Sequence, residues 1–240
     1  MIKLSNVPKE WIETNGKGIR IGIIDSGCDI KHKNLHISDY KIFGQENLTH
    51  GTHITGIISS NAKNYSTHGF CNKSEIIFAA CDFVNYKSLN HLIKSLEWIE
   101  EKKINVLNLS FALKKDYDQV RNLLKKISEK TIICSSYSKE LKYPHSYDFV
   151  TSVGKNLTDN ADIIAKGNFI STFPNDSYSE LSGSSMATAF VSSVFGIAKA
   201  YDINLSKDSI INKIKGNDLY IPEKNIFSTH SKQIIFKRKK

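Results

Sequence analysis

The chain contains 240 residues, of which 40% are hydrophobic and 24% are charged, and its formal net charge at pH 7 is +9. This composition is ordinary for a globular protein, and no apolar run approaches the ~20 residues that cross a bilayer, which excludes a membrane-spanning protein. Residues 1–20 also lack the unbroken apolar segment of a signal peptide, so we expect a cytoplasmic protein.

Apolar runs alternate with helical patterns along the whole chain, and neither a repeat nor a linker divides it. Buried strands are expected at five places: 19–24, 75–80, 104–110, 130–136 and 148–154. Between them, segments 88–102 and 116–128 repeat apolar residues at helical spacing. Strands without strict polar alternation, separated by amphipathic helices, are typical of a parallel sheet covered on both faces. The prediction is one doubly wound α/β domain over residues 1–240, with a mostly parallel sheet and its functional groups at the carboxyl ends of the strands.

Two polar motifs stand where such strands end and such helices begin. The first strand runs directly into Asp25 within "IIDSGCD", and Gly27 then turns the chain. In "THGTHITGII" (49–58), His50 and His53 precede the apolar face of a helix. A zinc site would need a third ligand at helical spacing, and none follows.

The third motif is "LSGSSMATAF" (181–190), where serines stand at the mouth of an otherwise apolar helix. A hydroxyl at that place lies near the positive end of the helix dipole and near free N–H groups, which can hold an oxyanion. A structural N-cap is the alternative role, and it is open to Ser182, Ser184 or Ser185. Together the motifs give Asp, His and Ser in the chain order of subtilisin.

On these three motifs the chain resembles the subtilisin-like serine proteases, or subtilases. The stretches "EWIEEKKINVLNLSFA" and "YPHSYDFVTSVG" extend the resemblance over nearly the whole sequence. The resemblance implies a subtilisin-like fold and a serine endopeptidase. It also assigns Ser185 as the nucleophile, His50 as the general base and Asp25 as the group that orients His50.

The resemblance also marks segments that bind the substrate and the oxyanion. "NLSFA" resembles the strand whose backbone pairs with an extended peptide. The substrate-binding residues that follow from the resemblance are Ser110, Phe111, Ala112, Cys134 and Ser135. Subtilases donate an asparagine side chain to the oxyanion, but "TIICSSYSKEL" (131–141) contains neither Asn nor Gln. Alignment of the strand end puts Tyr137 at that position, and a slip of one residue would select Ser136 or Ser138. In subtilisin, loss of this donor lowers turnover by about 10²–10³, so we expect slow or selective cleavage.

No metal or other cofactor is expected. The four cysteines, at positions 28, 71, 81 and 134, are scattered without CxxC spacing and are expected to be reduced thiols that serve packing. Calcium is common in subtilases, but segment 60–72 lacks the acids that a tight oxygen cage requires. The segment before Asp25 is also too short for the signal and prosegment typical of secreted subtilases, so we expect either a cytoplasmic enzyme that folds without a chaperone domain or a chain that has already been processed.

These features lead us to expect a selective processing endopeptidase whose partner is a peptide or protein substrate. An acidic leader peptide is one substrate class that the +9 charge would suit. The alternative is a subtilase-fold peptide-binding or regulatory protein with weak or no turnover, which the missing asparagine suggests. A third hypothesis, nucleic-acid binding, rests on the basic tail "FKRKK" (236–240), but the chain has no basic stripe interleaved with aromatics. We therefore expect neither a nucleic-acid nor a membrane partner, and we make no prediction of the oligomeric state.

Overall fold

The computed structural model describes residues 2–3, 7–64, 67–82, 88–216 and 233–236. The strands are β1 (Ile2–Lys3), β2 (Arg20–Asp25), β3 (Asp39–Ile42), β4 (Glu75–Ala80), β5 (Val106–Leu109), β6 (Ile132–Ser136), β7 (Thr151–Gly154), β8 (Ile163–Ala165), β9 (Asn168–Phe173), β10 (Ser177–Ser182) and β11 (Gln233–Phe236). The helices are α1 (Lys9–Glu13), α2 (Leu48–Ser59), α3 (Ser88–Glu101), α4 (Asp118–Ser128), α5 (Ser184–Tyr201) and α6 (Lys207–Gly216).

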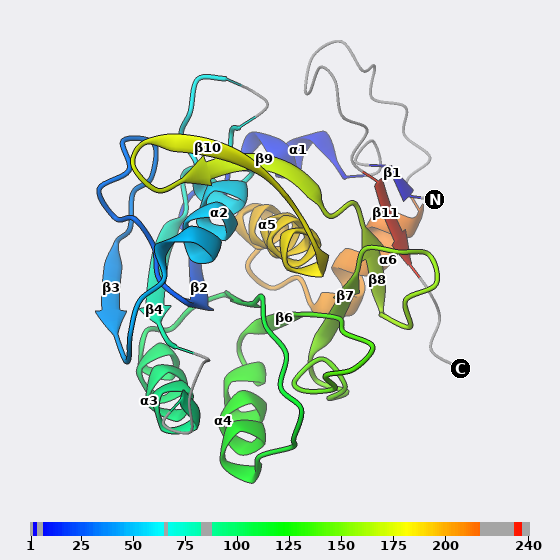
Figure 1. The fold of residues 1–240 in the computed structure, drawn as a ribbon. Helices are drawn as coiled ribbons and strands as arrows, with labels where there is room; N and C mark the ends of the chain where they lie inside the picture. The colour runs from blue at the N-terminus through cyan, green and yellow to red at the C-terminus, as the bar shows by residue number, and fades with distance from the viewer. Residues whose placement is uncertain (1, 4–6, 65–66, 83–87, 217–232, 237–240) are drawn as a thin grey trace.

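Nine of these strands form one sheet, and the other two form a hairpin (Figure 1). Seven neighbouring strands of the sheet run parallel in the order β8-β7-β6-β5-β2-β4-β3. Strands β11 and β1 extend the β8 edge in antiparallel fashion. The hairpin pairs β9 with β10 and stands apart from the sheet. The prediction of a doubly wound, mostly parallel α/β fold is confirmed.

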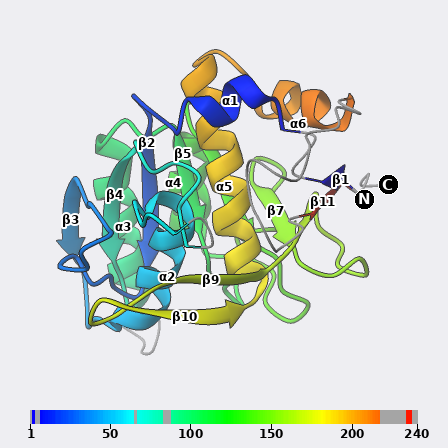
Figure 2. The same cartoon turned by 90° about the horizontal axis from the view of Figure 1, so that it is seen from above.

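Helices cover both faces of the sheet. Helices α3 and α4 lie on one face, and α1, α2, α5 and α6 lie on the other, where the hairpin packs over α2 (Figures 1 and 2). Each face has its own apolar core, because successive side chains of a strand point to opposite sides. In β5, for example, Val106 joins the core under α5, whereas Leu107 and Leu109 join the core under α3 and α4.

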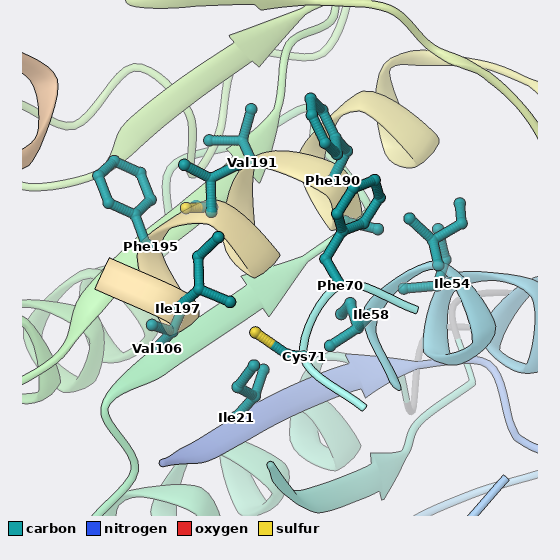
Figure 3. Close-up of a cluster of buried hydrophobic side chains, with 14 of the residues drawn as sticks. Ile21, Ile54, Ile58, Phe70, Cys71, Val106, Phe190, Val191, Phe195 and Ile197 are labelled. Carbon is teal, nitrogen blue, oxygen red and sulfur yellow. The ribbon is translucent and has the colours of Figure 1, made fainter. Parts of the chain in front are cut away.

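Helix α5 is the centre of the larger core. All of its residues from Met186 to Ala198 are buried. Figure 3 shows how its apolar side chains lie between α2 and the strands, with Phe190 facing Phe70 at a ring-centroid distance of 4.8 Å. These contacts pack α5 against α2 and against strands β5, β6 and β7 of the sheet. Among the described residues, no helix is long and apolar enough to cross a membrane.

Each of the four cysteines is buried and free, as expected of packing thiols. Burial raises the pKa of the Cys28, Cys81 and Cys134 thiols to about 12 and raises the pKa of Cys71 further. These thiols are therefore protonated and unreactive at neutral pH. Of the basic tail, residues 237–240 lie outside the described residues.

Candidate active site

The turn after β2 fixes where α2 begins. Gly27 has a φ of +146°, a conformation that side chains rarely adopt, and it lets the chain reverse beside Asn47. Ser26 makes two hydrogen bonds with the main chain of Asn47. Its carbonyl accepts the Asn47 N–H at 2.8 Å, and its hydroxyl donates to the Asn47 carbonyl at 2.9 Å. The Asn47 side chain caps α2 by accepting the Thr49 N–H. The first turn of α2, with His50, is thereby tied to the end of β2.

His50 and Asp25 form a close pair at this edge. His50 Nδ1 lies 2.8 Å from Asp25 Oδ1 and 3.0 Å from Oδ2. Asp25 is buried, and its Oδ1 also accepts the Ser26 N–H at 2.7 Å. Burial of His50 lowers its pKa, but the charge of Asp25 and the hydrogen bond to it outweigh burial and raise the pKa above the ordinary 6.5. Because a carboxylate can only accept, Nδ1 carries the proton and Nε2 is left as the basic nitrogen.

Ser185 lies in the first turn of α5. The N-cap of this helix is Gly183, which has no side chain to satisfy the first N–H groups. None of the three serines therefore caps the helix, and no side chain among the described residues caps its first-turn N–H groups, which can hold an anion. The Ser185 hydroxyl donates to the carbonyl of Ser110 at 3.0 Å, and within the described residues no hydrogen bond joins it to His50.

The sheet brings these two pairs side by side. Strands β2 and β5 are parallel neighbours with Ile24 opposite Leu109, so Asp25 and Ser110 follow at the same carboxyl edge, about 4.8 Å apart across the strands. His50 is hydrogen-bonded to Asp25, and Ser185 is hydrogen-bonded to Ser110. Helices α2 and α5 also pack against each other (Figure 1). The three motifs, remote in sequence, thus meet at one edge of the sheet.

The last residue of β6 and the two residues after it carry hydroxyls, at Ser136, Tyr137 and Ser138. Ser136 is buried and donates to the Phe111 carbonyl at 3.3 Å. Ser138 Oγ accepts the N–H groups of Glu140 and Leu141, so its own proton stays available. Tyr137 is half-buried, and its hydroxyl has no hydrogen-bond partner among the described residues. Within the described residues, the hydroxyls of Tyr137 and Ser138 are therefore the two that still have a proton to donate.

Comparison with known proteins agrees with this arrangement. The profile of the subtilase family (Peptidase_S8) matches residues 16–156 and 126–218 of the chain. The chain belongs to the subtilase family. The major intracellular serine protease of Bacillus subtilis (strain 168) is 24% identical over 91% of this chain and 79% of its own length. An intracellular serine protease of Paenibacillus polymyxa is 24% identical over 82% of this chain and 72% of its own, and Subtilisin BL of Lederbergia lenta is 22% identical over 89% and 88%. As a subtilase, the protein is a serine-type endopeptidase.

The predicted substrate-binding residues of this subtilase differ in accessibility. Phe111 and Ala112 are half-buried, and the backbone of Ala112 has no hydrogen-bond partner within the described residues, so it can pair with a peptide. The side chain of Ser110 is buried and bonded to α5. Cys134 and Ser135 are both fully buried. Both side chains lie in an interior strand of the sheet, and the role of these two residues in substrate binding stays a prediction.

His53 does not share a site with His50. It is fully buried, and its Nε2 lies 3.0 Å from the Ser179 carbonyl of the hairpin. Burial lowers the pKa of His53 to about 4, so the side chain is neutral at ordinary pH. Its role is to hold the hairpin against α2. Among the described residues, no three His, Cys, Asp or Glu side chains are grouped to hold a metal ion.

Asn108 and Ser192, which form a hydrogen-bonded network with Ser110, were not predicted from the sequence. Asn108, in the middle of β5, is fully buried and bonded to Ser110 and Ser192. The signal was present in the sequence, since an amide side chain interrupts the apolar run "INVLNLS" at a position that faces the core. Buried polar groups need partners, which should have marked Asn108 as part of a network.

Proposed function

We propose that this subtilase hydrolyses peptide bonds with Ser185 as the nucleophile, His50 as the general base and Asp25 as the group that orients His50. The observation that carries the proposal is the contact of His50 Nδ1 with the Asp25 carboxylate at 2.8 and 3.0 Å. It keeps the Nδ1 proton in place and leaves the Nε2 lone pair to accept a proton. The raised pKa of His50 supports the same assignment, because Asp25 stabilises the imidazolium that forms during the reaction.

The reaction proceeds by way of an acyl-enzyme. When a substrate docks, the Ser185 hydroxyl turns from the Ser110 carbonyl to His50 Nε2, in keeping with free enzymes whose catalytic contacts form fully only with substrate bound. Oγ bonds to the substrate carbonyl carbon as its proton passes to Nε2. The imidazolium gives that proton to the amide nitrogen as the C–N bond breaks. Water then attacks the ester and loses a proton to Nε2, the acid leaves, and the proton returns to Ser185.

The oxyanion is held by the free N–H groups of the first turn of α5 and by one hydroxyl from the segment after β6. We assign that hydroxyl to Tyr137, which is half-buried and has no other partner within the described residues. A phenol can donate one hydrogen bond in place of the amide. The tyrosine ring is anchored against His145, at a centroid distance of 5.1 Å. A larger donor in this position favours slow, selective cleavage over broad digestion.

The proposed substrate is an acidic segment, such as the leader of a larger peptide, bound as an added strand along Ala112. Antiparallel pairing of Leu113 with Tyr143 places the exposed Lys114 and Lys142 at neighbouring positions beyond this edge. Like charges so placed repel each other unless an anion lies between them. If this holds, the Michaelis constant for an acidic peptide rises with salt concentration, whereas a salt-independent constant contradicts it. The intracellular serine proteases among the relatives support an intracellular location for this step.

The competing function is a peptide-binding protein with little turnover, which the bond of Ser185 to Ser110 and the missing asparagine favour. A fluorophosphonate probe separates the two, since it labels only an activated serine. Labelling of the wild type, without labelling of Ser185→Ala or His50→Ala, supports the protease. A wild type that remains unlabelled while it still binds peptide supports the binding protein. Cut sites in a peptide library, read by mass spectrometry, then give the specificity.

A further inference from the structure

A buried polar network links β5 to the first three turns of α5. Asn108 Nδ2 donates to Ser110 Oγ at 2.9 Å, and Ser110 Oγ donates in turn to the Ser185 carbonyl at 3.1 Å. On the other side, the Ser192 hydroxyl donates to Asn108 Oδ1 at 3.0 Å. The network closes on the nucleophile, because the Ser185 hydroxyl donates to the Ser110 carbonyl at 3.0 Å.

The spacing of these residues defines how α5 sits on the sheet. Asn108 in β5 and Ser110 just after it are two apart, so their side chains point to the same side of this extended segment, and Ser185 and Ser192 are seven apart and therefore lie on the same side of α5. Two points of attachment, one at the first turn and one two turns later, fix both the rotation of the helix and its position along its axis. The apolar contacts of α5 cannot do this as sharply, because they are not directional.

The side chain of Asn108 is suited to fixing the position of α5 on the sheet and poorly suited to simple packing. It is fully buried, and a buried amide needs a partner for each of its polar atoms. Its fixed carbonyl and amino ends accept from Ser192 and donate to Ser110 at the same time. A leucine of similar size would fill the space without those constraints, but it would leave the helix free to slide or turn.

We propose that Asn108 is a positioning residue: through Ser110 it sets the place of Ser185 relative to His50. The proposal rests on the proposed role of Ser185 as nucleophile. It explains why Ser110 contacts both the main chain and the side chain of Ser185. A displacement of about 1 Å at a reacting atom is enough to lower a rate 10²-fold, so loss of the network affects the chemical step far more than substrate binding.

The test compares the wild type with Asn108→Leu, Ser110→Ala and Ser110→Thr, and uses Ser193→Ala as the matched control. Ser193 is also a buried serine of α5, but its hydroxyl donates within the helix, to the Ala189 carbonyl at 2.9 Å. For each folded variant, kcat, KM and the rate of labelling by a fluorophosphonate are measured. A purely structural role would change the unfolding midpoint of all variants alike and leave these rates close to those of Ser193→Ala.

We expect Asn108→Leu and Ser110→Ala to lower kcat and the labelling rate about 10–100-fold with KM nearly unchanged, as for a misplaced nucleophile. Ser110→Thr keeps the hydroxyl and should recover most of the rate lost in Ser110→Ala. Should Asn108→Leu fail to fold, Ser192→Ala, which removes one hydroxyl, is expected to lower the same rates by a smaller factor. Rates in all these variants equal to those of Ser193→Ala overturn the inference. A wild type that does not label at all would instead overturn the proposed function.

Discussion

Replacement of Gly51 by alanine is expected to separate His50 from Asp25 while the protein stays folded. Gly51 follows His50 in the first turn of α2. A Cβ built on it overlaps the Gly27 carbonyl oxygen and lies 2.7 Å from Phe78 Cζ and 3.2 Å from Asp25 Cβ. Carbon atoms pack at about 3.5–4.0 Å, so α2 must move away from β2 by about 1 Å. The Gly27 oxygen belongs to the backbone and cannot swing aside.

The same displacement has unequal effects on stability and on turnover. Alanine favours a helix over glycine by about 1 kcal/mol, whereas overpacking costs about 1–3 kcal/mol, so the net loss of stability is at most about 2 kcal/mol. A shift of about 1 Å, however, takes the 2.8 Å contact between His50 Nδ1 and Asp25 Oδ1 beyond hydrogen-bonding range. Misplacement of this size lowers turnover by about 10²-fold.

The assay measures kcat with a peptide substrate and the free energy of unfolding in urea. Gly196→Ala is the matched control, because its Cβ would lie 2.7 Å from Cys71 Sγ and 3.0 Å from Ile21 Cδ1. Gly196 is eleven residues from Ser185 along α5, about 16 Å at 1.5 Å per residue. The control should lose stability and keep its kcat. Wild-type kcat in Gly51→Ala, or an equal loss of kcat in Gly196→Ala, would refute the reasoning.

Three further predictions test the electrostatics of the site and its surroundings. Asp25→Asn keeps the burial that lowers the pKa of His50 and removes the charge that raises it. The acidic limb of the kcat/KM profile should therefore move from above pH 6.5 to lower pH, with turnover reduced about 10⁴-fold. An unmoved limb would show that His50 is not the titrating base. The pKa of His53 is about 4 in the folded protein and about 6.5 in the unfolded chain, so below pH 6.5 the unfolded chain binds the proton more readily. The free energy of unfolding should therefore fall by about 3 kcal/mol between pH 6.5 and pH 4. Urea unfolding at both pH values should show that loss diminished in His53→Gln, and an equal loss in both proteins would contradict it. Tyr137→Phe is expected to lower kcat by about 10²–10³, the effect of one lost oxyanion donor, with Ser138→Ala nearly neutral; the reverse result would assign the role to Ser138.

Much of the fold follows from local patterns. The five predicted strands all occur, since apolar runs rich in isoleucine or valine, such as that ending at Asp25, are typical of a covered parallel sheet. Strand β3 and the β9–β10 hairpin were not predicted, because their residues are partly exposed and lack a clear apolar pattern. Their stability comes from contacts with distant elements, such as the bond from Ser171 Oγ to the His53 carbonyl at 2.9 Å.

The sequence by itself determined the order of the motifs and the kind of element each one ends or begins, because strand ends and helix starts are set by neighbouring residues. That is enough to place Asp25, His50 and Ser185 at one edge of the sheet. Tertiary structure alone decided the partner of each polar side chain: Ser185 bonds to Ser110, and Asn108 connects to Ser192. Such bonds join residues that are far apart in the chain, and they depend on distances of a few tenths of an ångström that only the packed core of α5 and β5 sets.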